Sequence, residues 1–231
     1  MPHVKAGKMK EIKGAIFDID GTLLDSLHVW RIATERFLES VGCTGDAEMG
    51  RALKVMSLEE GCVFLRDHFG LSMTPEEIRM GLLTTIRDYY RNEVELKPGA
   101  NEFVRAFASL HLPMVLATTG DGEAVKGALE RHGLWEYFDK LFTSLELGTS
   151  KRDPATFIKC AEYMGISPEE TVVFEDSFFA VDAAKEAGCP VVVLWDRSND
   201  AITDELKEKA DLYMKEFDFE EFRKFMKERA E

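Results

Sequence analysis

The chain has 231 residues, of which 45% are hydrophobic and 31% are charged, and it carries a formal net charge of −14. This composition is typical of a globular protein with a substantial core, so the fold needs neither disulfides nor a structural metal. The strong negative charge disfavours binding to a polyanion, and we therefore expect no nucleic-acid partner.

Membrane insertion and secretion are not expected either. No apolar run approaches the roughly 18 residues of a membrane span, and the opening segment MPHVKAGKMK lacks the apolar stretch of a secretory signal. The cysteines are scattered without a CxxC pair, as expected for buried, reduced side chains. We expect a cytoplasmic protein that is a monomer or a weak dimer.

The first half of the chain predicts one strand followed by helices. Residues 14–19 (GAIFDI) fit a buried strand, a DGT turn follows, and an amphipathic helix is expected over about 26–41. Residues 42–94 keep helical spacing with no clear strand. Within them SMTPEE marks a helix start, with Thr74 as N-cap and Pro75 at the first helical position.

The second half predicts strands that alternate with helices. Lys97-Pro98-Gly99 interrupts the helical pattern. The strands expected after it cover 113–119, 140–144, 171–176, 190–195 and 211–214. This alternation predicts an α/β fold with a doubly wound, Rossmann-like parallel sheet covered by helices on both faces. We expect a catalytic core of residues 1–25 and 95–231, with an all-helical cap, residues 26–94, inserted after the first strand.

Polar residues stand where several of these strands end. Asp18 and Asp20 follow the first strand, Thr118 ends the second, and Glu175 and Asp176 end the fourth. Open parallel sheets bind ligands at the carboxyl ends of their strands. Clustered carboxylates are costly unless a cation neutralises them, and hard oxygen ligands favour Mg²⁺. The sequence therefore predicts a magnesium site at this edge of the sheet.

The segment Asp18-Ile19-Asp20-Gly21-Thr22 is the strongest single signal. Asp18 ends a hydrophobic strand, and Asp20, two residues on, is able to face the same side. Gly21 permits a tight departure of the backbone, close enough to contact a phosphate. The competing interpretation is an ordinary DG turn, which a lone DxDG often is. Its position at the end of a buried strand favours the functional interpretation.

Four ordered motifs resemble those of the haloacid dehalogenase-like superfamily, and the resemblance covers nearly the whole chain. DIDGTLLDS, which begins at Asp18, resembles the first motif, and VLAT, which ends at Thr118, resembles the second. Lys151 in TSKRDPATF resembles the third, and FEDS, with Glu175 and Asp176, resembles the fourth. The helical insert after the first motif is similar to the family's cap in the beta-phosphoglucomutase-like branch.

The resemblance implies a role for each of the acidic residues. Asp18 would be the nucleophile that forms an acyl phosphate. Asp20 would act as general acid for the leaving alcohol and then as general base for the attacking water. Mg²⁺ would be held by the Asp18 side chain, the Asp20 backbone carbonyl and Asp176, with Glu175 binding it directly or through water.

The same resemblance assigns the phosphate-binding groups. The Thr118 hydroxyl would bind a phosphoryl oxygen with help from the backbone N–H groups of Thr119 and Gly120. Lys151 would neutralise both the phosphate and Asp18, which repel each other by about 4 kcal/mol for unit charges 4 Å apart in an effective dielectric of 20. Taken singly, Thr118 also fits an ordinary strand residue, and Lys151 also fits an ordinary surface lysine.

Two departures from the family pattern bear on the reaction. Mutases of the beta-phosphoglucomutase type carry a cap histidine that meets the second aspartate and an arginine that grips a second phosphate. The matching positions here are Trp30 and Leu58, and the nearby His28 is out of register. These losses favour hydrolysis over phosphoryl transfer within one sugar. Dehalogenases lack an aspartate at the position of Asp20.

We therefore expect a Mg²⁺-dependent phosphatase that acts on a small phosphorylated metabolite through an aspartyl-phosphate intermediate. A phosphosugar mutase is the main alternative. A non-catalytic binding protein is a third, although such a protein would normally have lost Asp18 or Asp20. The charged residues Arg51, Lys54 and Arg87 of the insert are candidates for reading the substrate, and solvated helix-surface charge is the default interpretation of each.

Overall fold

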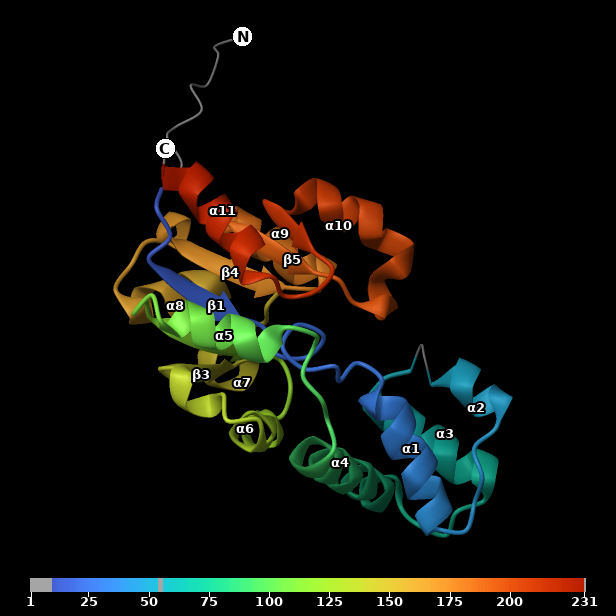
Figure 1. Cartoon of the computed structure of the whole chain (residues 1–231). Coiled ribbons are helices and arrows are strands. Elements are labelled where there is room, and N and C mark those ends of the chain that lie inside the picture. The colour runs from blue at the N-terminus through green and yellow to red at the C-terminus, as the bar shows by residue number, and fades with distance from the viewer. Residues whose placement is uncertain (1–9, 54–55, 231) are drawn as a thin grey trace. The chain divides into compact units, whose positions relative to one another are not determined.

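The computed structural model describes residues 10–53 and 56–230 of the chain. Two compact units emerge from the contacts within the chain. The core unit combines Met1–Asp25 with Glu95–Glu231, and the helical unit is Ser26–Val94. Figure 1 shows the two units in colours that follow the chain.

The described residues of the core unit form a six-stranded sheet in the order β3-β2-β1-β4-β5-β6, with every pair of neighbours parallel. The strands are β1 (Gly14–Phe17), β2 (Met114–Thr118), β3 (Lys140–Thr143), β4 (Thr171–Glu175), β5 (Val191–Leu194) and β6 (Leu212–Met214). Residues of β1, β2, β4 and β5 are buried throughout, which is why these strands are nearly continuous apolar runs. The predicted α/β fold with a parallel, doubly wound sheet is confirmed.

Helices follow the strands and cover both faces of the sheet. They are α5 (Ala100–Ala108), α6 (Gly122–Arg131), α7 (Ser144–Leu147), α8 (Ala155–Met164), α9 (Phe178–Glu186), α10 (Thr203–Lys209) and α11 (Phe219–Ala230). One face carries a phenylalanine cluster. In it the rings of Phe17 and Phe174 are stacked with their centres 4.3 Å apart, and both rings contact Phe107 of α5. The other face packs Ile16 and Val173 against Phe157 of α8.

The helical unit contains α1 (Val29–Ser40), α2 (Ala47–Ala52), α3 (Leu58–Phe69) and α4 (Pro75–Asn92). The predicted start of α4 is confirmed: Thr74 accepts a hydrogen bond from the Glu77 N–H, and the Glu77 carboxylate accepts one from the Thr74 N–H. The apolar faces of these helices form a separate core around Leu38, Leu65 and Ile78, so the unit has its own hydrophobic interior.

The two chain segments that connect the units pair with each other inside the core unit. Leu24 and Leu96 form an antiparallel bridge, the Asp25 N–H donates to the Glu95 carbonyl at 2.9 Å, and the Lys97 N–H donates to the Leu23 carbonyl at 2.8 Å. The segment that leaves the core unit and the segment that returns to it are therefore hydrogen bonded to each other.

The expected strands are one or two residues too long at their ends, and two further differences have a local cause. The first helix begins at Val29, because residues before it form turns. The expected strand over 140–144 ends at Thr143, whose hydroxyl accepts a hydrogen bond from the Glu146 N–H and so caps α7 at once. The described residues contain no helix long and apolar enough to cross a bilayer.

Candidate functional site

The sheet order explains why the candidate residues meet. β1 lies between β2 and β4, with Phe17 in register with Leu116 and with Phe174. Asp18 is the first residue beyond β1, and its N–H donates to the Phe174 carbonyl at 2.9 Å. The side chains that end these three central strands therefore gather at one edge, as ligand sites in parallel sheets do.

Lys151 joins two of these strand ends from a distant loop. It lies just before α8 and is only 8% exposed. Its ammonium donates a short hydrogen bond to Asp18 Oδ1 and another to Glu175 Oε1, the latter at 2.5 Å. A buried ammonium needs compensating charge, and these two carboxylates provide it.

Three buried carboxylates converge beside this lysine. Asp18, Glu175 and Asp176 can each offer an oxygen so that the three atoms lie within 4.8 Å of one another. Asp18 Oδ2 is buried and has no hydrogen-bond partner among the described residues. An unsatisfied buried carboxylate oxygen within a cluster of acids is unfavourable for the protein alone. The donor set is all oxygen, and it fits a hard divalent cation.

The electrostatics of the cluster are those of charges removed from water. Burial raises the pKa of Asp18 to about 6, with Glu175 adding to the increase and Lys151 opposing it. Burial, Glu175 and Asp18 likewise raise the pKa of Asp176 well above its usual value. For Lys151, burial acts to lower the pKa, but Asp18 and Glu175 outweigh it and raise the pKa above its usual range. The two carboxylates therefore favour the protonated form of Lys151.

Glu175 has a structural task besides its contact with Lys151. Its Oε2 accepts hydrogen bonds from the N–H groups of Asp176 at 2.9 Å and Ser177 at 2.8 Å. Ser177 is the N-cap residue of α9 but makes no side-chain capping bond. The Glu175 carboxylate therefore satisfies backbone donors where the chain turns from β4 into α9 and fixes the direction of Asp176.

The phosphate-binding candidates lie beside Asp20. The Thr118 hydroxyl donates to Asp20 Oδ2 at 3.4 Å and accepts from the Gly120 N–H at 2.9 Å. A Cβ at Gly120 would lie 3.0 Å from Asp20 Oδ2, so the loop passes close to this carboxylate. Thr119 is exposed.

Two residues that received no role from the sequence contact Asp176. The Thr22 hydroxyl donates to Asp176 Oδ1 at 3.3 Å. Asn199 Nδ2 lies 3.0 Å from the Asp176 carbonyl oxygen and 3.2 Å from Asp176 Oδ2. The only signal in the sequence was position: Asn199 follows β5, the neighbour of β4, at the same edge of the sheet.

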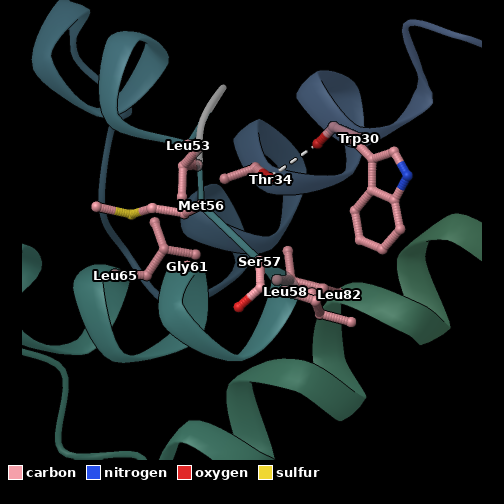
Figure 2. A pocket seen from close by; sticks show the side chains of 9 residues that line it. All are labelled: Trp30, Thr34, Leu53, Met56, Ser57, Leu58, Gly61, Leu65 and Leu82. Carbon is pink, nitrogen blue, oxygen red and sulfur yellow. Dashed lines mark hydrogen bonds between the residues drawn. The ribbon is translucent and has the colours of Figure 1, made fainter.

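The helical unit contains a cavity of about 320 Å³, whose lining side chains are shown in Figure 2. The lining residues are Trp30, Thr34, Leu53, Met56, Ser57, Leu58, Gly61, Leu65 and Leu82. None of these described residues is charged. The Thr34 hydroxyl donates to the Trp30 carbonyl at 2.8 Å, and the Ser57 hydroxyl accepts from the Glu60 N–H at 3.2 Å. The wall is therefore apolar, with its hydroxyls used in local bonds.

The other candidates of the helical unit lie elsewhere. His28 is hydrogen bonded to the Tyr89 hydroxyl at 2.9 Å, which fits the packing interpretation. Arg51 and Arg87 are exposed and do not line the cavity described above. Lys54 lies outside the described residues.

Comparison with known proteins agrees with this architecture. The family model described as haloacid dehalogenase-like hydrolase matches residues 15–194. YhcW of Bacillus subtilis, a candidate phosphatase, is 30% identical over 185 residues, which cover 79% of this chain and 83% of that protein. A phosphorylated carbohydrates phosphatase of Thermotoga maritima is 27% identical over 177 residues, covering 77% and 82%.

A solved structure shares the fold over most of the chain. The crystal structure of a candidate beta-phosphoglucomutase from Thermotoga maritima is similar with a TM-score of 0.79 and 26% identity, covering 88% of this chain and 94% of that one. The ordered motifs, the six-stranded parallel sheet and these matches lead to one conclusion. The chain belongs to the haloacid dehalogenase-like hydrolase family.

Proposed function

We propose that this protein is a Mg²⁺-dependent phosphatase that hydrolyses a small phosphorylated metabolite through an aspartyl phosphate on Asp18. One observation carries the proposal: Asp18 is buried, held by Lys151 through one oxygen, and has its other oxygen unpartnered among the described residues beside two more carboxylates. The family is one of hydrolases, and the relatives named above include phosphatases.

The Mg²⁺ ion would be held by the side chains of Asp18 and Asp176 and by the backbone carbonyl of Asp20. When bound, it would supply positive charge that offsets repulsion between the carboxylates and an incoming phosphate. We place Glu175 behind these ligands, because both of its oxygens already accept hydrogen bonds from Lys151, Asp176 and Ser177. Its task is to orient Asp176.

In the first half of the reaction, a carboxylate oxygen of Asp18 attacks the phosphorus of the monoester. The bond from phosphorus to the ester oxygen breaks as an acyl phosphate forms on Asp18. Asp20 donates its proton to the departing oxygen, which leaves as an alcohol. Lys151 stays protonated throughout and offsets the charge on the transferred group.

In the second half, Asp20 takes a proton from water, and the resulting oxygen nucleophile attacks the phosphorus of the acyl phosphate. The bond to Asp18 breaks, inorganic phosphate leaves, and both aspartates return to their starting states. The Thr118 hydroxyl and the Thr119 N–H would bind phosphoryl oxygens. The Thr118–Asp20 hydrogen bond supports this placement, because it puts the hydroxyl beside the proposed proton donor.

Hydrolysis is favoured over mutase activity by the contents of the helical unit. Trp30 and Leu58, which stand where the mutases carry a histidine and an arginine, both line the cavity, whose described lining residues are uncharged. No lining side chain among the described residues can grip a second phosphate. The similarity to a candidate mutase structure is the reason to test the mutase alternative. A mutase would give an isomer of its substrate and no free phosphate.

We also propose that the helical unit is the cap that supplies substrate specificity. Its cavity supports this assignment, since the described lining residues offer the apolar surface that specificity pockets typically use. The substrate is a small phosphorylated metabolite, with no nucleic-acid or membrane partner. We propose a cytoplasmic protein that is a monomer or a weak dimer.

The test is phosphate release from an aryl phosphate by the wild-type protein and by Asp18→Asn, each with Mg²⁺ and with a chelator. We expect wild-type activity that the chelator abolishes, and a loss of at least about 10⁴-fold in Asp18→Asn, because the nucleophile is removed. Asp88→Asn, an exposed aspartate of α4, is the matched control and should retain full activity. Mg²⁺-dependent activity retained in Asp18→Asn would refute the proposal.

A further inference from the structure

A second cavity opens at the carboxyl ends of β5 and β6, and its lining contains none of the proposed catalytic residues. Its volume is about 550 Å³, which is in the usual range for small-molecule sites. We call it the β5–β6 cavity. The residues of its wall that matter here are Lys97, Trp195, Lys207, Tyr213 and Lys215. All belong to the core unit.

Three lysines lie in this wall, although the chain as a whole carries a net charge of −14. Lys97 is buried and paired with Asp196 at 2.7 Å. Lys207 is exposed, and among the described residues its ion pair is a long contact of 3.4 Å to Asp204, whose side chain is itself almost fully exposed. Lys215 is exposed and makes no side-chain hydrogen bond or ion pair with any described residue. Two ammonium groups are therefore available for an anion.

The same wall also carries two acids. Asp200 accepts a hydrogen bond from the Trp195 indole N–H at 2.9 Å, which fixes its carboxylate against the ring. Glu216 also lines the cavity. Lys97 is neutralised by Asp196, so the cations that the wall offers are the exposed ammonium groups of Lys207 and Lys215.

Two aromatic side chains supply the apolar part of the wall. The Lys97 ammonium lies 5.7 Å from the centre of the Trp195 ring, and the Lys207 ammonium lies 5.4 Å from the centre of the Tyr213 ring. Each ring therefore stands beside a cation. This combination suits a ligand that has an apolar flat portion to contact the rings and an anionic group to meet the ammonium groups.

We propose that the β5–β6 cavity binds a small anionic molecule that contains a flat ring, at a site separate from Asp18. None of the residues that we place in catalysis lines this cavity. One wall, however, is formed by Trp195 and Asp200, which flank the loop that carries Asn199 and its two bonds to Asp176. The site adjoins the catalytic cluster through that loop.

The probe is the methylene phosphonate analogue of adenosine 5′-monophosphate, in which carbon replaces the ester oxygen so that the holoenzyme cannot hydrolyse it. Isothermal titration calorimetry with Mg²⁺ present should give a dissociation constant of about 0.1 to 1 mM. Adenosine, which lacks the anion, and inorganic phosphate, which lacks the ring, should each bind at least about tenfold more weakly at this cavity.

Two full-length variants decide the location of binding. In the double variant Lys207→Ala with Lys215→Ala, affinity for the phosphonate should fall about tenfold or more, while turnover of an aryl phosphate stays at the wild-type level and shows that the fold is intact. The matched control, Lys224→Ala with Lys227→Ala on α11, removes the same charge elsewhere and should bind as the wild type does.

Unchanged affinity in the double variant would overturn the proposal, and so would no binding of the phosphonate to the wild type at millimolar concentration. Loss of affinity in Asp18→Asn but not in the double variant would place the probe at the catalytic site and would also overturn it. An equal loss of affinity in the α11 control would show that the effect depends only on overall charge, and it would also overturn the proposal.

Discussion

In the core unit, Lys151 and Asp18 are 8% and 4% exposed and contact each other, with Glu175 completing the group. In the helical unit, charged pairs such as His68 with Asp46 lie at the surface, and the cavity is lined by uncharged side chains. The same kinds of residue thus occur in two very different environments. Burial in low dielectric makes the first set strongly interacting, whereas water screens the second.

This difference in environment suits the core unit to catalysis and the helical unit to ligand selection. Buried charges that hold one another in place form a preorganised electrostatic environment, which is what phosphoryl transfer requires. Apolar walls cannot stabilise developing charge, but they can select the shape and polarity of a ligand. The contrast predicts that substitutions of similar size have unequal effects in the two units.

The largest effect among charge-compensating residues is expected for Lys151→Met, which keeps most of the volume and removes the cation. Asp18 and Glu175 would then be buried without their partner, so we expect a loss of about 3 to 5 kcal/mol in the free energy of unfolding, measured by urea denaturation without metal. Turnover with Mg²⁺ should fall roughly 10² to 10³-fold. Lys224→Met, an exposed lysine of α11, is the control. Turnover of Lys151→Met within about threefold of the wild type would contradict the claim that the buried charges of the core unit support catalysis.

An intermediate effect is expected for Asn199→Ala, which removes both hydrogen bonds to Asp176. Because outer contacts orient a metal ligand, the Mg²⁺ concentration for half-maximal activity should rise about tenfold, with a smaller change at saturating Mg²⁺. Titration of activity with Mg²⁺ measures this shift. Asn92→Ala at the exposed end of α4 makes the same change in the helical unit and should leave the titration unaltered. Identical curves for the two variants would show that Asn199 does not position Asp176.

The smallest effect is expected for the His68–Asp46 pair of the helical unit. The hydrogen bond to Asp46 raises the pKa of His68, so its contribution to stability is fully present below pH 6.5 and is lost as the pH rises through the folded-state pKa. Because the pair is exposed, His68→Gln should change the melting temperature by about 2 °C or less. An NMR titration of the imidazole protons gives the folded-state pKa directly. A value at or below 6.5 would contradict the assignment of this pair.

The sequence was a good guide where burial restricts composition. The run TVVFE at 171–175 is a strand in the structure because an interior strand covered on both faces accepts little besides apolar side chains. Polar residues at the end of such a run are conspicuous, which is why Glu175 and Asp176 could be found. The start of α4 at Thr74 was readable because its capping pattern is local.

Other features depend on packing that no local pattern encodes. Asn199 bonds to Asp176 across 23 positions of the chain, and nothing around it distinguishes it from an ordinary loop residue. Helical spacing in the insert indicated which faces are apolar, but not that Trp30 and Leu58 line one cavity. The early end of β3 came from a competition between strand and helix at Ser144 that the Thr143 cap decides.

The bonding of Glu175 limits what evolution can place at that position. Its Oε1 faces the ammonium of Lys151, and its Oε2 faces two backbone N–H groups, so every neighbour donates and the side chain must only accept. A glutamine has the same shape, but its NH₂ group would face either the Lys151 ammonium or the two backbone N–H groups, and each of these is itself a donor. An aspartate is one methylene too short to span both sets. Hydrogen-bond direction and side-chain length together thus make this position a single-residue requirement, whether or not the carboxylate ever touches an ion.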